Sequence, residues 1–339
     1  MAPLADQSWR AVPVPWQRRW GKRLLWLLVL LVLVVLGGLI YEPLAEGFQL
    51  RATPPPGRVV QGNGLDMHLQ VAGSPSRPTV LLFNAWGLPS ASWGWVLPKV
   101  AQSNLTVRWD PPGYAWSGYR DTPMDAASEV DRLHTMLKAY DVAGPYLLVG
   151  SGLGAVEARV FAVRYPDEVA GMVLLDPWHQ PLMADPGPRI EALERDASLR
   201  RFSWHRFRDW WNKVPEPEYN LPPSDERVVL ASSRTVKEAK AKAAELRGMA
   251  ADFELAQANQ TLGQKPLVIL TSANLDKDGS DGPWATGAQA ARIQMDDLLS
   301  KLSTQGKHIV VPGATPTSLL CRQDLADQVI QAIQGAAGH

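Results

Sequence analysis

The stretch Tyr146-Leu-Leu-Val-Gly-Ser-Gly-Leu-Gly-Ala155 decides the fold of this chain. Its first four residues are apolar and predict a short buried strand, whereas the three glycines that follow predict a sharp turn. A helical pattern runs from Ala155 to Tyr165. Gly152 stands at the apex of the turn, between Gly150 and Gly154. The stretch therefore predicts a strand, a tight turn and a helix that pack closely against one another.

Composition limits the possible classes of protein. The 339 residues include 34 basic and 34 acidic side chains, and 46% of the residues are hydrophobic. This length suits one large α/β domain with an accessory segment. The zero net charge lacks the basic footprint of a nucleic-acid-binding protein, so we expect no nucleic-acid partner. The single cysteine, Cys321, excludes an internal disulfide framework and a cysteine-based zinc site.

No motif for a bound cofactor or metal stands out. Neither a P-loop, nor a dinucleotide-binding glycine pattern after a first strand, nor H-E-x-x-H occurs. The stretch Asp276–Gly282 has some features of a calcium loop but lacks the terminal glutamate, and we interpret it as a polar loop. We therefore expect no cofactor and no metal.

The N-terminal region predicts a membrane anchor. Leu24–Ile40 is uncharged and strongly apolar, and Gly21 and Tyr41 extend it to a transmembrane helix over residues 21–41. Basic residues precede this run, namely Arg10, Arg18, Arg19, Lys22 and Arg23. The positive-inside rule then places residues 1–20 in the cytoplasm and the C-terminal domain on the periplasmic side of an inner membrane. A cleaved signal peptide is the alternative, but the run is long and lacks a good small-x-small site.

Beyond the anchor, the sequence predicts a stalk and then an α/β domain. Residues 42–57 include Pro54–Pro56 and are expected to form a proline-rich stalk. Residues 58–339 alternate short apolar strands with helical stretches, which is typical of a mostly parallel sheet covered by helices. Residues 177–263 lie between two such strands and are expected to form a helical lid insertion.

Four stretches of this domain resemble the α/β-hydrolase family of esterases, lipases and haloperoxidase-like proteins. They occur in the family's order. Phe83–Gly87 corresponds to the loop after the third strand, and Trp109–Ser117 to a following turn. Gly144–Gly150 corresponds to the strand that leads into the tight turn, and Phe161–Asp176 to the segment that follows that turn. The resemblance implies an α/β-hydrolase-like fold over roughly residues 59–335.

The resemblance also implies a catalytic triad, and two of its members are replaced. The family's nucleophile elbow is G-x-S-x-G, and here Gly152 occupies the serine position. The catalytic histidine aligns with Pro316, which can neither accept nor donate a proton. Asp176 is a candidate for a vestigial acid. Ser151 and His179 are the alternative groups if the chain is nonetheless an enzyme.

Other positions of the implied site are less distinctive. Asn274, Asp276 and Asp278 follow the strand after which the acid often stands in the family. By position, Trp86 and Leu153 supply the two backbone N–H groups that would face an oxyanion.

Tryptophan is abundant, and several tryptophans are candidates for contact with a partner or with the membrane. Tryptophan combines an apolar ring with one N–H donor, which suits protein and membrane interfaces. The candidates lie in the N-terminal tail and in the insertion: Trp9, Trp16, Trp20, Trp204, Trp210 and Trp211. Alternatively, the aromatic residues of Leu199–Trp211 belong to an amphipathic lid helix packed on the body.

Three functional hypotheses follow. In the first, the protein is a single-pass membrane protein with a catalytically inactive hydrolase-like domain, and serves as an accessory subunit of a membrane protein assembly such as a bacterial photosynthetic or respiratory complex. In the second, it is a membrane-tethered esterase with a non-standard active site. In the third, the emptied pocket binds a small apolar molecule.

Overall fold

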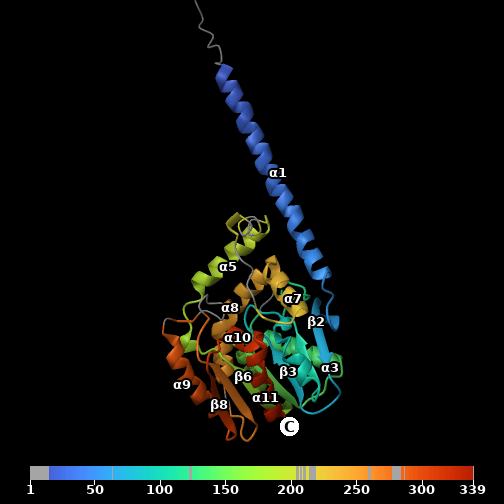
Figure 1. Ribbon diagram of the computed structural model, residues 1–339, viewed down its shortest axis with the longest axis vertical. Coiled ribbons are helices and arrows are strands. Elements are labelled where there is room, and N and C mark those ends of the chain that lie inside the picture. The colour runs from blue at the N-terminus through green and yellow to red at the C-terminus, as the bar shows by residue number, and fades with distance from the viewer. Residues whose placement is uncertain are drawn as a thin grey trace, which may run out of the picture.

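The computed structural model describes residues 15–338 apart from 63, 122–123, 204–205, 207, 209–210, 214–218, 259–260, 277–283 and 286; for 15–19, 43, 46, 48–51 and 62 it describes the backbone alone. A long N-terminal helix projects from a domain in which helices cover both faces of a twisted sheet (Figure 1).

The sheet has eight strands in the order β1-β2-β4-β3-β5-β6-β7-β8. β2 runs antiparallel to both of its neighbours, and all other neighbouring pairs are parallel. This confirms the predicted mostly parallel sheet. The strands are β1 (Arg58–Gly62), β2 (Leu65–Ala72), β3 (Thr79–Phe83), β4 (Thr106–Trp109), β5 (Tyr146–Ser151), β6 (Val169–Leu175), β7 (Leu267–Ser272) and β8 (Gly306–Val311).

Two apolar cores lie on the two faces of the sheet. One core joins the sheet to α3 (Ala126–Ala139), α4 (Leu153–Arg164) and α8 (Val236–Gln257). The other joins it to α2 (Leu97–Val100) and three further helices, which are α7 (Pro223–Ser233), α10 (Pro316–Cys321) and α11 (Gln323–Ala337). β5 is buried along its whole length because its side chains enter both cores.

The helical insertion lies between β6 and β7, as predicted. Its described elements are a 3-10 turn (Gln180–Leu182), α5 (Gly187–Arg200), α7 and α8. The composition of Glu226–Phe253 predicts a helical stretch. In the structure it divides into α7 and α8, because Thr235 caps α8 by accepting a hydrogen bond from the Glu238 amide. Between β7 and β8, α9 (Ala288–Ser300) packs against both strands.

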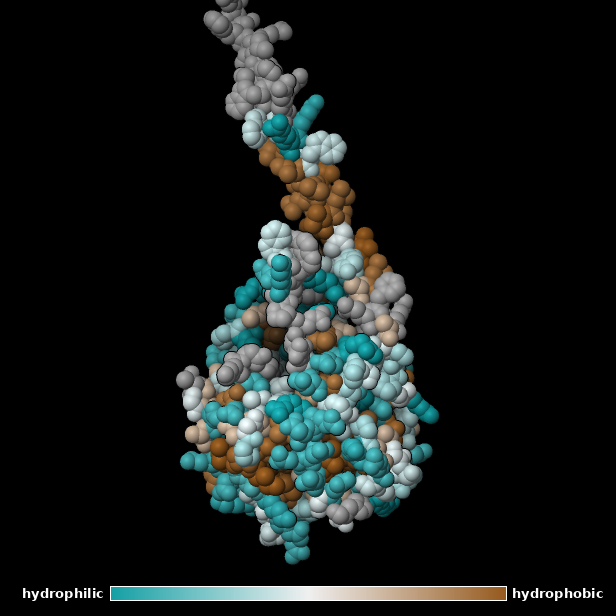
Figure 2. Space-filling view, in the orientation of Figure 1, coloured by the Kyte–Doolittle hydropathy of each residue, from teal (hydrophilic) through white to brown (hydrophobic). Residues whose placement is uncertain are grey.

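The N-terminal helix α1 spans Pro15–Arg51. Its segment Trp20–Glu42 contains an 18-residue window with a mean hydropathy of 2.9, and the segment is long and apolar enough to cross a membrane. Figure 2 shows this segment as a hydrophobic band with polar residues at its outer end. The expected stalk differs from the structure at its start, because residues 42–51 continue α1 and the helix stops only shortly before Pro54–Pro56.

A group of buried carboxyl groups lies beneath α8. Glu245 and Asp252 project from α8, Glu129 from α3 and Glu157 from α4, and all four are buried. Burial raises the pKa of Glu129 and Asp252 to about 7 and that of Glu245 to about 8. Burial and the neighbouring Glu245, Glu129 and Asp252 raise the pKa of Glu157 well above its ordinary value.

These shifts predict that stability falls as pH rises. The folded protein holds protons that the unfolded chain releases, so stability is lost as pH increases from about 4.5 through the folded-state pKa values near 7 and 8. We expect Glu157→Gln, which removes one of these ionisations, to raise the thermal midpoint at pH 8 by at least about 2 °C and to change it little at pH 5. Thermal unfolding of the full chain at both pH values measures this.

The matched control is Glu254→Gln, on the exposed side of α8. It should leave the midpoint unchanged at both pH values. A Glu157→Gln protein that is no more stable than the unsubstituted chain at pH 8 would contradict the effect assigned to the buried carboxyl groups.

Candidate functional site

The tight turn between β5 and α4 has the predicted frame. Ser151 is the last residue of β5, and Gly152 follows it with φ 56° and ψ −114°. Few L-residues adopt this backbone conformation, and it is typical of a strained strand-to-helix turn. A Cβ at Gly150 would lie 2.3 Å from the carbonyl oxygen of Gly154, and one at Gly154 would lie 2.3 Å from that of Asn84. The turn therefore requires both flanking glycines, and Gly152 rather than Ser151 is its apex.

A single small cavity brings the sequence-predicted triad positions together. Its volume is about 20 Å³, and its lining residues are Ala85, Trp86, Leu88, Ser151, Gly152, Asp176, Trp178, Pro316 and Thr317. The nucleophile, base and acid positions inferred from the resemblance thus surround one point at the carboxyl ends of the strands. A volume of this size accommodates about one water molecule.

Tryptophan side chains close the cavity above Gly152. A Cβ at Gly152 would lie 3.2 Å from Nε1 of Trp178, so the space beside the apex is taken up by this indole. The Trp178 ring lies 6.0 Å from the ring of Trp86, and both side chains are buried. Lys242 and Arg189 stand over the Trp86 ring at 5.0 and 4.8 Å, which holds α5 and α8 over the site.

Pro316 has a structural role where the family has its base. It is the first residue of α10, where the missing N–H of proline leaves no hydrogen bond unmade. Thr315 caps the helix, since its hydroxyl accepts from the Ser318 amide while the Ser318 hydroxyl accepts from the Thr315 amide. Asp276 also serves this helix end, because its carboxylate accepts a hydrogen bond from the Thr317 amide at 2.9 Å.

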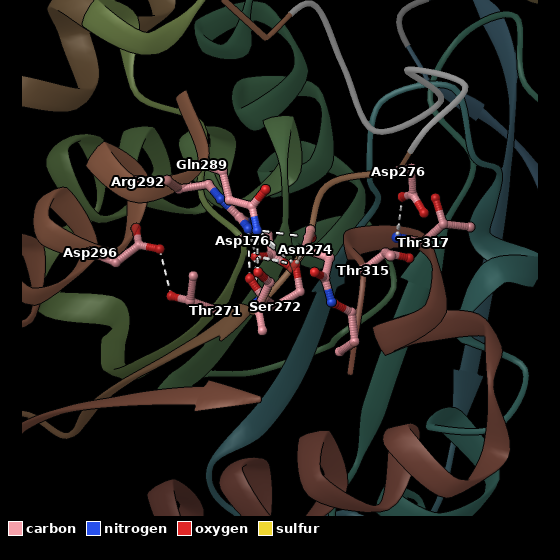
Figure 3. A network of polar contacts seen from close by, with 12 residues as sticks. Asp176, Thr271, Ser272, Asn274, Asp276, Gln289, Arg292, Asp296, Thr315 and Thr317 are labelled. Atoms are coloured by element: carbon pink, nitrogen blue, oxygen red, sulfur yellow. Dashed lines mark hydrogen bonds and ion pairs between the residues drawn. The ribbon is translucent and has the colours of Figure 1, made fainter. Parts of the chain in front are cut away.

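Asp176 is committed to a buried ion pair. Its carboxylate contacts the guanidinium of Arg292 and accepts hydrogen bonds from the amide and hydroxyl of Ser272 at 2.8 and 3.0 Å (Figure 3). The Arg292 side chain is fully buried and also donates to the Ser272 carbonyl at 2.6 Å. Burial raises the pKa of Asp176 to about 7, although Arg292 opposes the shift. Asp176 therefore fastens α9 to the sheet.

His179 is turned toward a second buried acid. Its Nε2 lies 2.6 Å from a carboxylate oxygen of Asp296, whose other oxygen accepts a hydrogen bond from the Thr271 hydroxyl. The same hydroxyl lies 2.8 Å from Nε2 of His308. Neither histidine lines the cavity at Gly152. The other histidines of the described residues, His68 and His134, pair with Asp110 and Glu168.

The loop expected to supply an oxyanion site is tied into the fold. The side-chain Nδ2 of Asn84 donates to the Trp109 carbonyl at 2.8 Å, and its side-chain oxygen Oδ1 accepts from the Trp93 indole at 3.1 Å. Trp86 donates through its indole to the Lys242 carbonyl at 3.3 Å. Leu153 is buried at the first position of α4.

Other predicted contact residues are dispersed. Trp20 is exposed at the start of the apolar segment of α1, and Trp211 is exposed in the insertion. Trp9, Trp204 and Trp210 lie outside the described residues, and of Trp16 only the backbone is described. Most of the Asp276–Gly282 loop also lies outside them, and the part of the chain that is described contains no cluster suited to a metal ion.

The partners of Asp176 were not predictable from the sequence. Arg292 lies within a helix without a motif, 116 residues from Asp176, and Ser272 ends β7 without any distinguishing pattern. Asp296 is four positions beyond Arg292, so both fall on one face of α9. An arginine and an aspartate four positions apart in a helix usually indicate a solvent-exposed face. The sequence therefore does not indicate that both side chains are buried and contact residues of other elements.

Comparison with known proteins places these features in context. No protein-family model matches the sequence. An uncharacterized protein of Schizosaccharomyces pombe is 36% identical over 92 residues, which is 27% of this chain and 17% of that protein. An uncharacterized protein of Bacillus subtilis is 30% identical over 115 residues, covering 34% of this chain and 46% of the relative. An uncharacterized vacuolar membrane protein of Saccharomyces cerevisiae is 27% identical over 148 residues, or 42% and 22% of the two chains. The chain thus spans less than half the length of these relatives.

Solved structures match over most of the chain. An α/β-hydrolase fold protein from Burkholderia ambifaria has a TM-score of 0.61 at 14% identity and covers 84% of this chain and 98% of its own. An esterase from Thermogutta terrifontis has a TM-score of 0.59 at 19% identity over 82% and 97% of the two chains. A bacterial membrane phospholipase A has a TM-score of 0.58 at 15% identity over 95% and 100%. The sheet order, the glycine-framed turn and these neighbours together identify the chain as an α/β-hydrolase fold protein, with one N-terminal apolar helix that could cross a membrane.

Proposed function

We propose that this protein is a membrane-anchored, catalytically inactive member of the α/β-hydrolase fold that acts as an accessory subunit of a membrane protein assembly. One observation carries the proposal: Gly152 and Pro316, at the nucleophile and base positions, line the same cavity of about 20 Å³. Neither residue has a side chain that can attack a carbonyl or move a proton.

The remaining polar groups of the cavity support the same conclusion. Asp176 could orient a base, but Arg292 and Ser272 hold Oδ1, one of the two oxygens of its carboxylate. Ser151 ends β5 and is 2% exposed, one position before the apex. Acyl transfer requires a nucleophile with a base within hydrogen-bond reach, and no histidine of the described residues lines this cavity.

The size of the cavity weighs against a ligand-binding role. Small-molecule pockets usually have volumes of roughly 300–1,000 Å³. The cavity at Gly152, at about 20 Å³, is far smaller. Trp86 and Trp178 occupy the space that a bound molecule would need.

The anchor supports a role at a membrane. The apolar segment Trp20–Glu42 is exposed over most of its length, and Lys22 and Arg23 stand at its start. On the positive-inside rule the N-terminus is cytoplasmic and the domain lies on the periplasmic side of an inner membrane. An inactive domain held at that surface is suited to binding other membrane subunits.

The first prediction concerns reactivity. We expect the full chain in detergent to hydrolyse an activated ester no faster than the unfolded protein does. We also expect no stoichiometric labelling by a fluorophosphonate probe, because no described serine at the cavity has a histidine beside it. Ser151→Ala should behave identically. Gly152→Ser restores a hydroxyl at the apex but no base, and should also remain at background.

An active serine esterase is the matched control for probe and substrate. Stoichiometric labelling that Ser151→Ala abolishes would contradict inactivity and favour a membrane-tethered esterase with a non-standard active site.

The second prediction concerns the role of Asp176. If it serves the fold, Arg292→Met should destabilise the protein by about 3–5 kcal/mol, because it removes the positive charge that pairs with the buried Asp176. The paired change Asp176→Asn with Arg292→Met should recover part of this loss. Denaturant unfolding of the four proteins forms the double-mutant cycle. Strictly additive effects would show that the pair does not stabilise the fold.

The third prediction concerns partners. Purification of the full-length protein from its native membrane in mild detergent should yield a complex larger than the detergent-bound monomer, containing other membrane proteins. Purification after strong detergent is the control, since it should release the monomer. A chain that migrates alone in both detergents contradicts the subunit role.

A further inference from the structure

The anchor helix and the insertion meet at a closely packed joint. A Cβ at Gly38 of α1 would lie 2.4 Å from the carbonyl oxygen of Phe202, so only glycine allows this approach of the two backbones. The neighbouring Gly37 has nothing within 4 Å of its Cβ position. The contact is therefore confined to one side of α1. Figure 1 shows the end of α5 and the segment after it beside this helix.

An ion pair reinforces the joint. Both carboxylate oxygens of Glu42 contact the guanidinium of Arg206, at 3.0–3.2 Å, and one also accepts from the Ser203 hydroxyl at 2.7 Å. The Glu42 side chain is 2% exposed and that of Arg206 18% exposed. Glu42 lies one helical turn beyond Gly38, so both contacts fix the same face of α1 against the insertion. Pairing also reduces the cost of charged groups close to a lipid environment.

The joint lies near the end of the apolar segment, where the proposed anchoring places the membrane boundary. The apolar segment ends at Glu42, and Gly38 stands four residues inside it. At a rise of about 1.5 Å per residue, Gly38 is about 6 Å closer to the middle of the bilayer than Glu42. The segment of 23 residues exceeds a hydrocarbon core of about 30 Å by only a few ångströms. Phe202, which touches Gly38, therefore lies at the depth where headgroups meet acyl chains.

Side chains near the joint have the composition of an interfacial segment. Leu199 is 42% exposed, Phe202 44% and Trp211 69%. Arg201 and Arg208 are exposed in the same part of the chain. Exposed apolar and aromatic side chains interleaved with arginine suit the boundary between acyl chains and anionic or zwitterionic headgroups.

We propose that the tip of the insertion, defined as Leu199–Ser203 together with Arg206, Arg208 and Trp211, enters the headgroup region of the bilayer that α1 crosses. Its partner is the lipid surface. This inference rests on the membrane anchoring proposed above. Attachment at two points, α1 and the tip, limits the tilt of the domain relative to the membrane and presents a constant face to neighbouring subunits.

Depth-dependent quenching tests the proposal in the full chain. Three variants each carry one added cysteine: Phe202→Cys in the tip, Leu31→Cys in the middle of the apolar segment, and Ile309→Cys on β8. Each variant is labelled with bimane and reconstituted into phosphatidylcholine–phosphatidylglycerol vesicles. Native Cys321 is buried, and the unsubstituted chain measures any background labelling. Ile309 is 43% exposed on β8, at the end of the domain away from α1 (Figure 1). Phe202→Cys leaves the backbone contact with Gly38 intact.

We expect lipids that carry a nitroxide on the headgroup or a shallow acyl carbon to quench the label at 202 by about half or more, and the label at 309 hardly at all. A nitroxide deep in the acyl chains should quench the label at 31. Quenching at 31 without quenching at 202 overturns the tip proposal and leaves the anchor standing, and it would favour a protein partner for this surface. Absence of quenching at 31 overturns both.

A matched pair of glycines tests the joint. Gly38→Leu should drive the tip away from α1 and reduce the quenching at 202 by about half or more, whereas Gly37→Leu, with open space around it, should not. Both variants should keep the label at 31 quenched. Undiminished quenching at 202 in the Gly38→Leu protein overturns the role given to the Gly38 contact.

Discussion

The close approach of three backbone segments at the start of α4 is the constraint on which the rest of the structure depends. A side chain at Gly150 or Gly154 would collide with backbone atoms of α4 or of the loop after β3. The positive φ of Gly152 turns the chain between the buried β5 and the buried α4. These demands concern the backbone and apply with or without a nucleophile. The turn therefore serves the packing of the fold independently of any nucleophile at its apex.

The groups around the cavity make contacts that stabilise the fold. Pro316 begins α10, Asp276 and Thr315 satisfy amides at its first turn, and Arg292 neutralises Asp176. No single substitution restores a triad, because a serine at the apex lacks a base. A histidine in place of Pro316 would also have to fit a cavity of about 20 Å³.

The fold was predictable because its signals are local. Apolar runs and turn residues predict the strand before Gly150 and the helix after Gly154. The resemblance of four ordered stretches to the α/β-hydrolase family predicts the arrangement of the sheet. Gly152, Pro316 and Asp176 could be brought together in advance because parallel strands present their carboxyl ends on one edge. No local pattern in the sequence predicts the contacts between residues far apart in the chain, such as that of Asp176 with Arg292.

The errors of prediction have physical causes of the same kind. Residues 42–51 were expected to form a stalk, but they continue α1 through Pro43 and Gly47. The division of the insertion helix at Thr235 depends on a cap that competes with a continuous helix. The burial of Arg292 and Asp296 could not be predicted from the sequence, because their partners lie on other elements.

The insertion connects the membrane joint to the closure of the cavity. Phe202 contacts α1 directly after α5, and α5 packs along α8. α8 in turn holds the loop after β3: the Lys242 carbonyl accepts from Trp86, and Glu245 accepts from the Tyr114 hydroxyl, which itself accepts from the Gly87 amide. A lid that opened for substrate would have to break these buried contacts while its other end is tied to the anchor. The insertion therefore links α1 to the residues that close the cavity.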